Sequence, residues 1–266
     1  MTGWMRSSTP SGASGVAGRP TIAELRAITQ PPSIFARNSG EHWAGRLYVR
    51  RLSPYLTRIL LRTGISPDGV TWLMILSGLA AAGVLAIGGI GAAIGAALLI
   101  QLQILLDCSD GELARWLDRK SPVGVYLDRI GHWTTEAALP IALGVSVDLT
   151  TVGLVTAVLV LLVKGESALV TVARAESGLP PASDVAAVAA PRAGALAALR
   201  RAARGLPFYR AFVAIEFTLL ALVAALVDLF VADHDATRVL VWALLPCAAL
   251  TAAGHLVAIL ASKRLR

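Results

Sequence analysis

The middle of the chain holds three aspartates and one histidine whose spacing suits metal chemistry. They lie in two short stretches, LLDCSDGELARW and VGVYLDRIGHW. Asp107 and Asp110 are three residues apart and share one face of a helix, while Asp128 and His132 are four apart and share a face of the next helix. These two faces together offer four potential ligands for a divalent metal ion.

The apolar surroundings of this cluster favour a functional interpretation. Ionisable groups at membrane depth are costly, so they normally face a wet cavity and mark a functional site. The alternative is that these helix ends protrude into the cytosol, where Asp and Arg side chains are simply solvated.

The composition indicates a membrane protein. Hydrophobic residues make up 56% of the 266 residues, charged residues only 15%, and the mean hydropathy is +0.68. A helix needs about 20 apolar residues to cross a bilayer. The stretches that reach this length are 70–89, 91–110, 123–146, 150–173, 208–231 and 238–261. The predicted fold class is therefore all-α, an integral membrane bundle of six transmembrane helices.

The Lys and Arg residues fall on one side of the predicted spans. The connections at 88–91, 147–151 and 228–237 contain none, whereas the other connections and the C-terminus contain many. Cytoplasmic loops carry this excess, so both termini and the acidic cluster are predicted to be cytoplasmic. The formal net charge of +7 suits a membrane surface. No basic face interleaved with aromatic residues is present, so nucleic acid is not an expected partner.

The chain divides into three predicted segments. Residues 1–40 begin with a Ser-, Gly- and Pro-rich stretch and lack the apolar core of a signal peptide, so they are predicted to be a disordered cytoplasmic tail. Residues 41–66 set apolar side chains among arginines, the pattern of an amphipathic helix in the headgroup layer. Residues 67–263 form the six-span domain, in which 177–205 is predicted to be a partly helical cytoplasmic loop.

The spacing of the acidic cluster also matches a known signature, Asp-x2-Asp-Gly-x2-Ala-Arg-x8-Gly-x3-Asp-x3-Asp. The chain therefore resembles the CDP-alcohol phosphotransferase family. The matching positions are Asp107, Asp110, Gly111, Ala114, Arg115, Gly124 and Asp128. The resemblance implies a six-span enzyme that works as a homodimer; outside the motif it rests on the layout of the chain alone.

The resemblance implies roles for the motif residues. Asp107, Asp110 and Asp128 would hold two divalent metal ions, either Mg²⁺ or Mn²⁺. These ions would bind the diphosphate of a CDP-linked donor. Gly111 and Ala114 would let the nucleotide approach the helix backbone.

Four further positions complete the implied nucleotide site. Arg115 and Gly124 belong to the same motif. The stretch SPDGVT is similar to the family's Pro-Asn-x-x-Thr at the start of the first span, which makes Asp68 and Thr71 further candidate contacts.

The last motif position departs from the family. The family has an aspartate there, taken to be the general base, and this chain has His132 beside Asp128. Imidazole titrates nearer to neutral pH than a carboxylate does, so proton removal can survive the change. The loss of a hard oxygen ligand should weaken the binding of a second Mg²⁺ and favour the binding of Mn²⁺ or Zn²⁺. Three interpretations stay open: a working base, a metal ligand with a changed preference, or the relic of a lost activity.

Charged residues elsewhere in the spans are candidates for binding an acceptor's phosphate. The candidate cations are Lys164, Arg174 and Arg210. Lys164 and Glu166 are expected either to pair with each other or to line the cavity. Glu216 is an acid inside a span whose partner the sequence does not name. Two of the other histidines, His42 and His255, lack neighbours at ligand spacing and are expected to have no catalytic role.

Together these observations predict a membrane transferase. It would move a substituted phosphate, with phosphatidyl from CDP-diacylglycerol favoured, to a hydroxyl of a small alcohol or polyol phosphate and release CMP. The Arg- and Ala-rich composition suggests the inner membrane of a bacterium. One alternative is a family member that binds nucleotide or metal without transfer. Another is a cation transporter, but transporters place their sites near the midplane and often show internal repeats.

Overall fold

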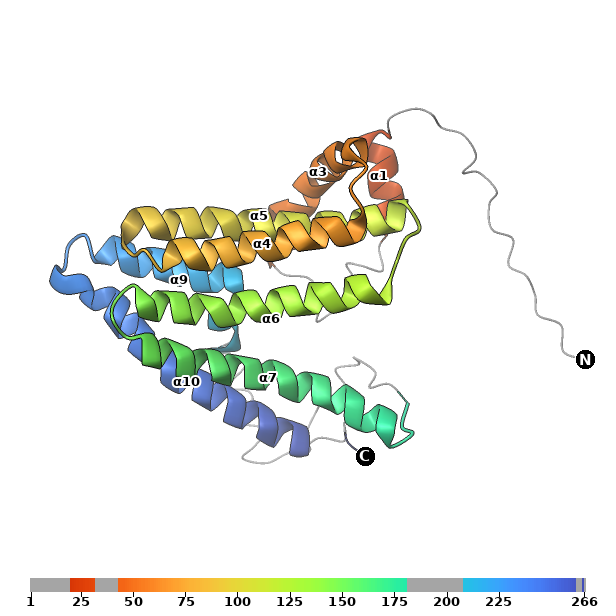
Figure 1. The fold of residues 1–266 in the computed structure, drawn as a ribbon. Helices are drawn as coiled ribbons and strands as arrows, with labels where there is room; N and C mark the ends of the chain where they lie inside the picture. The colour runs from red at the N-terminus through yellow and green to blue at the C-terminus, as the bar shows by residue number, and fades with distance from the viewer. Residues whose placement is uncertain (1–19, 32–42, 181–207, 262–264, 266) are drawn as a thin grey trace, which may run out of the picture.

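The computed structural model is a bundle of long helices that lie side by side and alternate in direction (Figure 1). It describes residues 20–31, 43–180, 208–261 and 265, and no strand occurs in these ranges. The elements in chain order are α1 (Ile22–Thr29), the π-helix η1 (Gly45–Val49), α3 (Arg50–Thr63), α4 (Pro67–Leu85), α5 (Gly89–Trp116), α6 (Pro122–Val145), α7 (Thr150–Glu176), the 3-10 helix η3 (Phe208–Phe212), α9 (Ala214–Val227), the 3-10 helix η4 (Ala232–His234) and α10 (Asp235–Leu260).

Two helices begin at the same end of the bundle with the same Ser-Pro sequence. Ser66 accepts a hydrogen bond from the Gly69 amide at the start of α4, and Ser121 accepts one from the Gly124 amide at the start of α6. A serine satisfies an otherwise unpaired amide there, and proline at the first helical position loses nothing because its missing N–H would have had no partner. These caps fix where α4 and α6 start, close to the acidic cluster.

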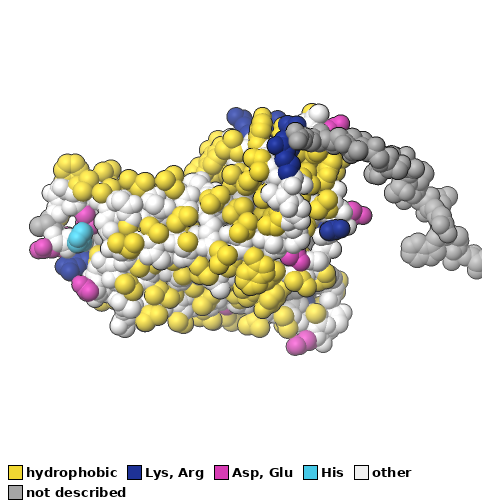
Figure 2. All heavy atoms as spheres, turned by 45° about the horizontal axis from the view of Figure 1, so that its top comes forward, with side chains coloured by type: hydrophobic (Ala, Val, Ile, Leu, Met, Phe, Trp, Pro, Cys, Tyr) yellow, Lys and Arg dark blue, Asp and Glu magenta, His cyan; other side chains and the backbone are white. Residues whose placement is uncertain are grey.

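Four helices are long and apolar enough to cross a bilayer by themselves: α4, α5, α7 and α10. Helix α6 does not qualify because every 18-residue window within it contains Asp128, Arg129 and Glu136. The all-α membrane fold is confirmed, whereas the count of six spans stays a prediction. Figure 2 shows hydrophobic side chains across the middle of one face, with charged side chains gathered towards its ends.

The fifth predicted span, 208–231, is corrected. Helix α9 has only 14 residues, and Val213 before it is extended at φ −71° and ψ 133°. This break separates α9 from η3. At the other end α9 stops before Asp228, whose carboxylate accepts a hydrogen bond from the Ala236 amide at 2.8 Å and so turns the chain into α10.

The predicted disordered tail is also corrected in part, because residues 22–29 form helix α1. The Thr21 side chain caps the Glu24 amide while the Glu24 carboxylate accepts from the Thr21 amide, a reciprocal capping box. These hydrogen bonds, led by the one from the Thr21 backbone, lower the pKa of Glu24. Leu25 and Thr29 are fully buried, so α1 is docked on the bundle. The rest of the predicted tail, and the predicted loop at 181–205, lie outside the described residues.

Helix α3 turns polar side chains towards the bundle and apolar ones outward. Ser53 and Thr57 are fully buried, whereas Leu52, Tyr55 and Ile59 are more than half exposed. A helix lying in the headgroup layer presents its apolar face to lipid, so this arrangement agrees with the interfacial position predicted for 41–66.

Helix α4 packs against both α5 and α6 and thereby sets the distance between them. Gln103 on α5 donates a hydrogen bond of 2.8 Å to Thr135 on α6 across this contact, and both side chains are buried. Gly78 of α4 faces this hydrogen bond, and a Cβ at that position would overlap both side chains. The close approach at Gly78 therefore lets α4 lie between the two helices that carry the acidic cluster.

Candidate active site

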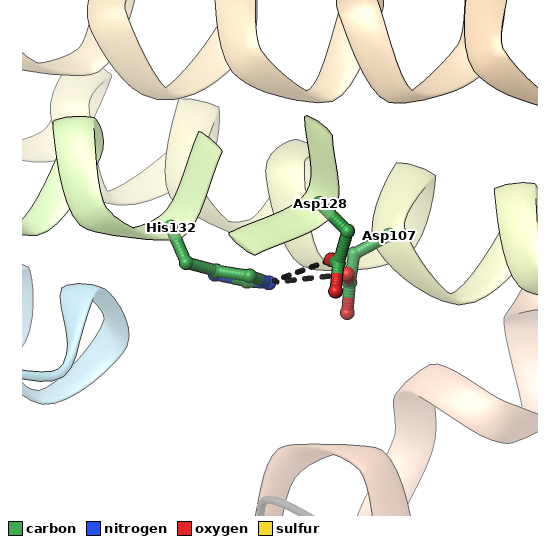
Figure 3. Close-up of side chains that lie close together, drawn as sticks. All are labelled: Asp107, Asp128 and His132. Carbon is green, nitrogen blue, oxygen red and sulfur yellow. Dashed lines mark hydrogen bonds and ion pairs between the residues drawn. The ribbon is translucent and has the colours of Figure 1, made fainter. Parts of the chain in front are cut away.

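The structure brings together three of the four predicted metal ligands. Asp107 on α5 meets Asp128 and His132 on α6 (Figure 3), and their ligand atoms all lie within 4.8 Å of one another. His132 Nε2 lies 3.2 Å from Asp107 Oδ1 and 3.4 Å from Asp128 Oδ1. The side chains of Asp107, Asp128 and His132 are 30%, 43% and 34% exposed, so the cluster is open on one side.

The fourth predicted ligand, Asp110, is engaged elsewhere. It lies one turn after Asp107 on α5, and its Oδ2 accepts a hydrogen bond of 2.7 Å from the Thr71 hydroxyl of α4. Thr71 is buried. The predicted nucleotide contact Thr71 and the predicted metal ligand Asp110 are therefore neighbours, and Thr71 fixes the orientation of the carboxylate.

The predicted nucleotide contacts Asp68 and Gly124 also lie together. Asp68 Oδ1 accepts a hydrogen bond of 3.3 Å from Ser121 Oγ. A Cβ at Gly124 would come within 2.9 Å of the same Asp68 oxygen. Gly124 thus permits the start of α6 to lie directly against the start of α4.

The remaining motif residues, Gly111, Ala114 and Arg115, lie at the end of α5. The Arg115 guanidinium covers Gly111, because a Cβ there would be 3.1 Å from one of its terminal nitrogens. Arg115 Nε donates a 2.6 Å hydrogen bond to the Thr29 carbonyl at the end of α1. Ala114 lies half-buried on the same helix end. Arg115 therefore links the motif to the N-terminal helix.

The donor set of the cluster fits a divalent cation. Two carboxylates and one imidazole that converge on one point, each partly exposed, suit Mn²⁺ or Zn²⁺ at least as well as Mg²⁺, because one donor is nitrogen. Asp110 adds a third carboxylate one helical turn away. No other group of three His, Cys, Asp or Glu side chains at ligand spacing occurs among the residues that the structure describes.

The comparison with protein families decides the classification. The model of the CDP-alcohol phosphatidyltransferase family matches residues 65–253, well over half of the chain. The chain belongs to this family. The match confirms the predicted family and the predicted enzyme class, a CDP-alcohol phosphotransferase. Because the family uses divalent metal ions, the predicted cofactor class is confirmed as well.

Solved structures with the same fold include three of phosphatidylinositol phosphate synthase (PgsA1) from Mycobacterium tuberculosis. The structure with manganese and citrate has a TM-score of 0.51 at 19% identity and covers 79% of this chain and 90% of that one. The structure with CDP-DAG bound has 0.50 at 19%, with 80% and 96% covered. The apo form has 0.50 at 20%, with 80% and 98% covered. A comparison with curated proteins finds no match.

The sequence left two alternatives for Lys164 and Glu166, pairing with each other or lining the cavity, and the structure excludes the first. Lys164 does not pair with Glu166; its Nζ lies 2.6 Å from Glu136 Oε2 of α6. Glu166 instead accepts from His255 Nδ1 of α10 at 2.8 Å. Residues two apart on a helix point to different sides, so Lys164 and Glu166 face different neighbours.

The other predicted side chains also have partners. Arg174 donates to the Pro180 carbonyl at 2.9 and 2.7 Å. Glu216 accepts a hydrogen bond of 3.0 Å from Trp43 and lies 3.8 Å from Arg210. His42 lies outside the described residues.

Sequence reasoning missed two acids close to the site. Glu112, inside the motif, is fully buried and accepts from Ser53 at 2.5 Å and from Thr57 at 2.7 Å. Gln30 donates to it at 2.8 Å. Glu136 lies four residues after His132, which continues the four-residue spacing from Asp128; this spacing was the available signal.

Proposed function

We propose that this family member transfers the phosphatidyl group of CDP-diacylglycerol to the hydroxyl of a small alcohol and releases CMP. The observation that carries the proposal is the convergence of Asp107, Asp128 and His132 within 4.8 Å on two adjacent helices. CDP-DAG bound to the related synthase supports the choice of donor. The reaction would belong to phospholipid biosynthesis.

In the proposed reaction the hydroxyl oxygen of the acceptor forms a bond to the phosphorus that carries the diacylglycerol. The bond between that phosphorus and the bridging oxygen of CMP breaks, and the electron pair leaves with CMP. His132 takes the hydroxyl proton. Its Nε2 faces Asp107 and Asp128, so an Nε2–H donated to these carboxylates leaves Nδ1 to accept the proton. The carboxylates then stabilise the imidazolium.

Asp107, Asp128 and Asp110 would hold the divalent metal. When bound, the metal would neutralise the negative charge of the donor's diphosphate and the charge that develops on CMP as it leaves. A second ion is part of the proposal, as in the prediction from the motif. Manganese in the related synthase supports this assignment of the site.

The surroundings of the reaction are also part of the proposal. We place the enzyme in the inner membrane of a bacterium as a homodimer, with both termini and the active site on the cytoplasmic side. The arginines near the end of the bundle that holds the site support this orientation. Nucleotide substrates are also supplied from the cytoplasm.

The test is CMP release by purified protein in detergent, with CDP-diacylglycerol, Mn²⁺ or Mg²⁺, and a pool of small alcohols and their phosphates. Acceptor-dependent CMP release is expected from the wild type. Asp107→Asn should abolish it, because the site loses a charged ligand, and His132→Ala should reduce it at least about a hundredfold. Thr134→Val is the control, because Thr134 is exposed and, among the described residues, its hydroxyl donates only to carbonyls of its own helix.

His132→Asp separates a working enzyme from a silent one. If His132 works as the base, His132→Asp should stay active with its pH optimum moved to lower pH, because a carboxylate titrates below an imidazole. A shift of preference from Mn²⁺ to Mg²⁺ would instead show that His132 is a metal ligand. A silent wild type that gains activity as His132→Asp would contradict transfer as the natural function. It would favour a family member that binds nucleotide or metal without turnover.

A further inference from the structure

A cavity lies next to the catalytic cluster, between α6, α7, η3 and α10. Its volume is about 140 Å³, and Glu136, Lys164, Tyr209, Phe212 and Thr251 are among the residues that line it. Glu136 follows His132 by four residues and therefore lies on the same face of α6, one turn deeper. A cavity of about 150 Å³ holds a molecule of roughly six heavy atoms. The cavity is thus large enough for a small acceptor and close to the proposed base.

An ion pair forms the polar side of this cavity. Lys164 Nζ lies 2.6 Å from Glu136 Oε2, and the two side chains are only 23% and 10% exposed. Lys164 is the one Lys or Arg among the residues that line the cavity in the described part of the chain. An unpaired charge at this depth would be costly, so each member of the pair holds the other in place. The cavity as a whole presents no net charge.

This pairing argues against a phosphorylated acceptor in the cavity. A phosphate dianion bound to Lys164 would either break the ion pair or lie beside the Glu136 carboxylate, and both are unfavourable in a poorly hydrated site. The other candidate cations are engaged too, since Arg210 faces Glu216 and Arg174 holds the Pro180 carbonyl. An uncharged polyol meets no such penalty.

The same groups suit the hydroxyls of an uncharged polyol. The Glu136 carboxylate can accept a hydrogen bond from one hydroxyl, and the Lys164 ammonium can donate one to another. The apolar side chains around them, such as Val160 and Phe212, can pack on the C–H groups of a three-carbon polyol such as glycerol. Resting on the proposed function, we infer that the Glu136–Lys164 cavity binds the acceptor and selects an uncharged polyol over its phosphate ester.

The test compares glycerol with glycerol 3-phosphate as acceptors. The readout is the ratio of kcat/KM for the polyol to that for the phosphate, measured as CMP release. The wild type should favour the polyol. Glu136→Gln frees the charge of Lys164 and should shift the ratio towards the phosphate by about tenfold or more. A merely structural ion pair would lower both values and leave the ratio unchanged.

Glu166→Gln is the matched control. It removes an acid from the other ion pair of α7, with His255, away from the cavity. It should leave the ratio unchanged. Preference of the wild type for the phosphate, or an unchanged ratio in Glu136→Gln, would overturn the inference.

Binding measured without donor separates this inference from the proposed function. Equilibrium dialysis with radiolabelled glycerol and glycerol 3-phosphate needs no turnover. Glycerol should bind to the wild type and more weakly to Lys164→Met, whereas glycerol 3-phosphate should bind better to Glu136→Gln than to the wild type. If these binding results hold while no CMP appears, the transfer proposal fails and the cavity assignment stands. If CMP appears but glycerol does not bind in the cavity, the reverse is true.

Discussion

The hydroxyl of Thr71 holds the carboxylate of Asp110 through a hydrogen bond of 2.7 Å. Thr71→Val keeps the shape of the side chain but removes the hydroxyl that orients the carboxylate. A hydrogen bond to a charged group contributes about 1.5–3 kcal/mol, so CMP release, measured well below the melting temperature, should fall roughly tenfold to a hundredfold. The melting temperature should fall as well, because a buried hydrogen bond is lost. Activity equal to that of Thr134→Val would show that Asp110 needs no such support.

Single side chains account for most of the difference between the predicted and the observed site. Helical spacing correctly brought Asp128 and His132 onto one face, and the motif placed Asp107 opposite them. Spacing could not show that Asp110 would meet Thr71, because that contact depends on how α4 lies against α5. The partners of Lys164 and Glu166 were missed for the same reason, since both come from other helices.

Whole elements show which sequence signals were read and which were overlooked. Helices α4 to α7 begin and end within a few residues of the predicted spans, apart from the six-residue extension of α5, because apolar length and Ser-Pro starts define them. Helix α1 was missed although Thr21 and Glu24 have the spacing of a capping box. The docking of α1 against α5 could not be read from the sequence, because it depends on the buried acid Glu112.

The contacts of Glu112 predict a stabilising role for the N-terminal helices. Gln30 donates to Glu112 at 2.8 Å and to the Arg50 carbonyl at 2.9 Å. Gln30→Ala removes one hydrogen-bond donor from each of these acceptors, which should lower the free energy of unfolding by about 1–3 kcal/mol. The expected result is a lower melting temperature in detergent. Ile28→Ala on the exposed side of α1 is the control, and equal melting of the two variants would show that α1 contributes little to stability.

The contact between α4, α5 and α6 predicts strong sensitivity at one glycine. Gly78→Ala places a methyl group against the hydrogen-bonded Gln103 and Thr135, and overpacking of this kind costs about 1–3 kcal/mol. Thermal unfolding should detect the loss. Gly83→Ala on the same helix has nothing within 4 Å of the new atom and should be neutral or slightly stabilising. A stable Gly78→Ala would mean that the helices separate easily.

The whole molecule has a predicted orientation that the arrangement of helices makes testable. Lys120 lies in the connection between α5 and α6 at the site end, and Thr150 begins α7 at the opposite end; both are exposed. In a variant with Cys108 and Cys247 replaced by alanine, a membrane-impermeant maleimide should label Thr150→Cys in intact cells. Lys120→Cys should react only after permeabilisation. The opposite pattern would invert the proposed topology.

The sequence predicts the orientation because the distribution of Lys and Arg between the two sides does not depend on the details of the fold. The number of spans, in contrast, depends on local breaks such as Val213.

The short helix α9 has a consequence for the lipid around the enzyme. Its 14 residues extend only about 21 Å, whereas the hydrocarbon layer is about 30 Å thick. A bilayer answers such a mismatch by thinning and drawing its headgroups inward. Next to α9 lies η3, which lines the Glu136–Lys164 cavity, so we expect thinning at α9 to bring water and polar solutes closer to this cavity. We therefore expect the thickness of the surrounding bilayer to affect the reaction, alongside the concentrations of donor, acceptor and metal.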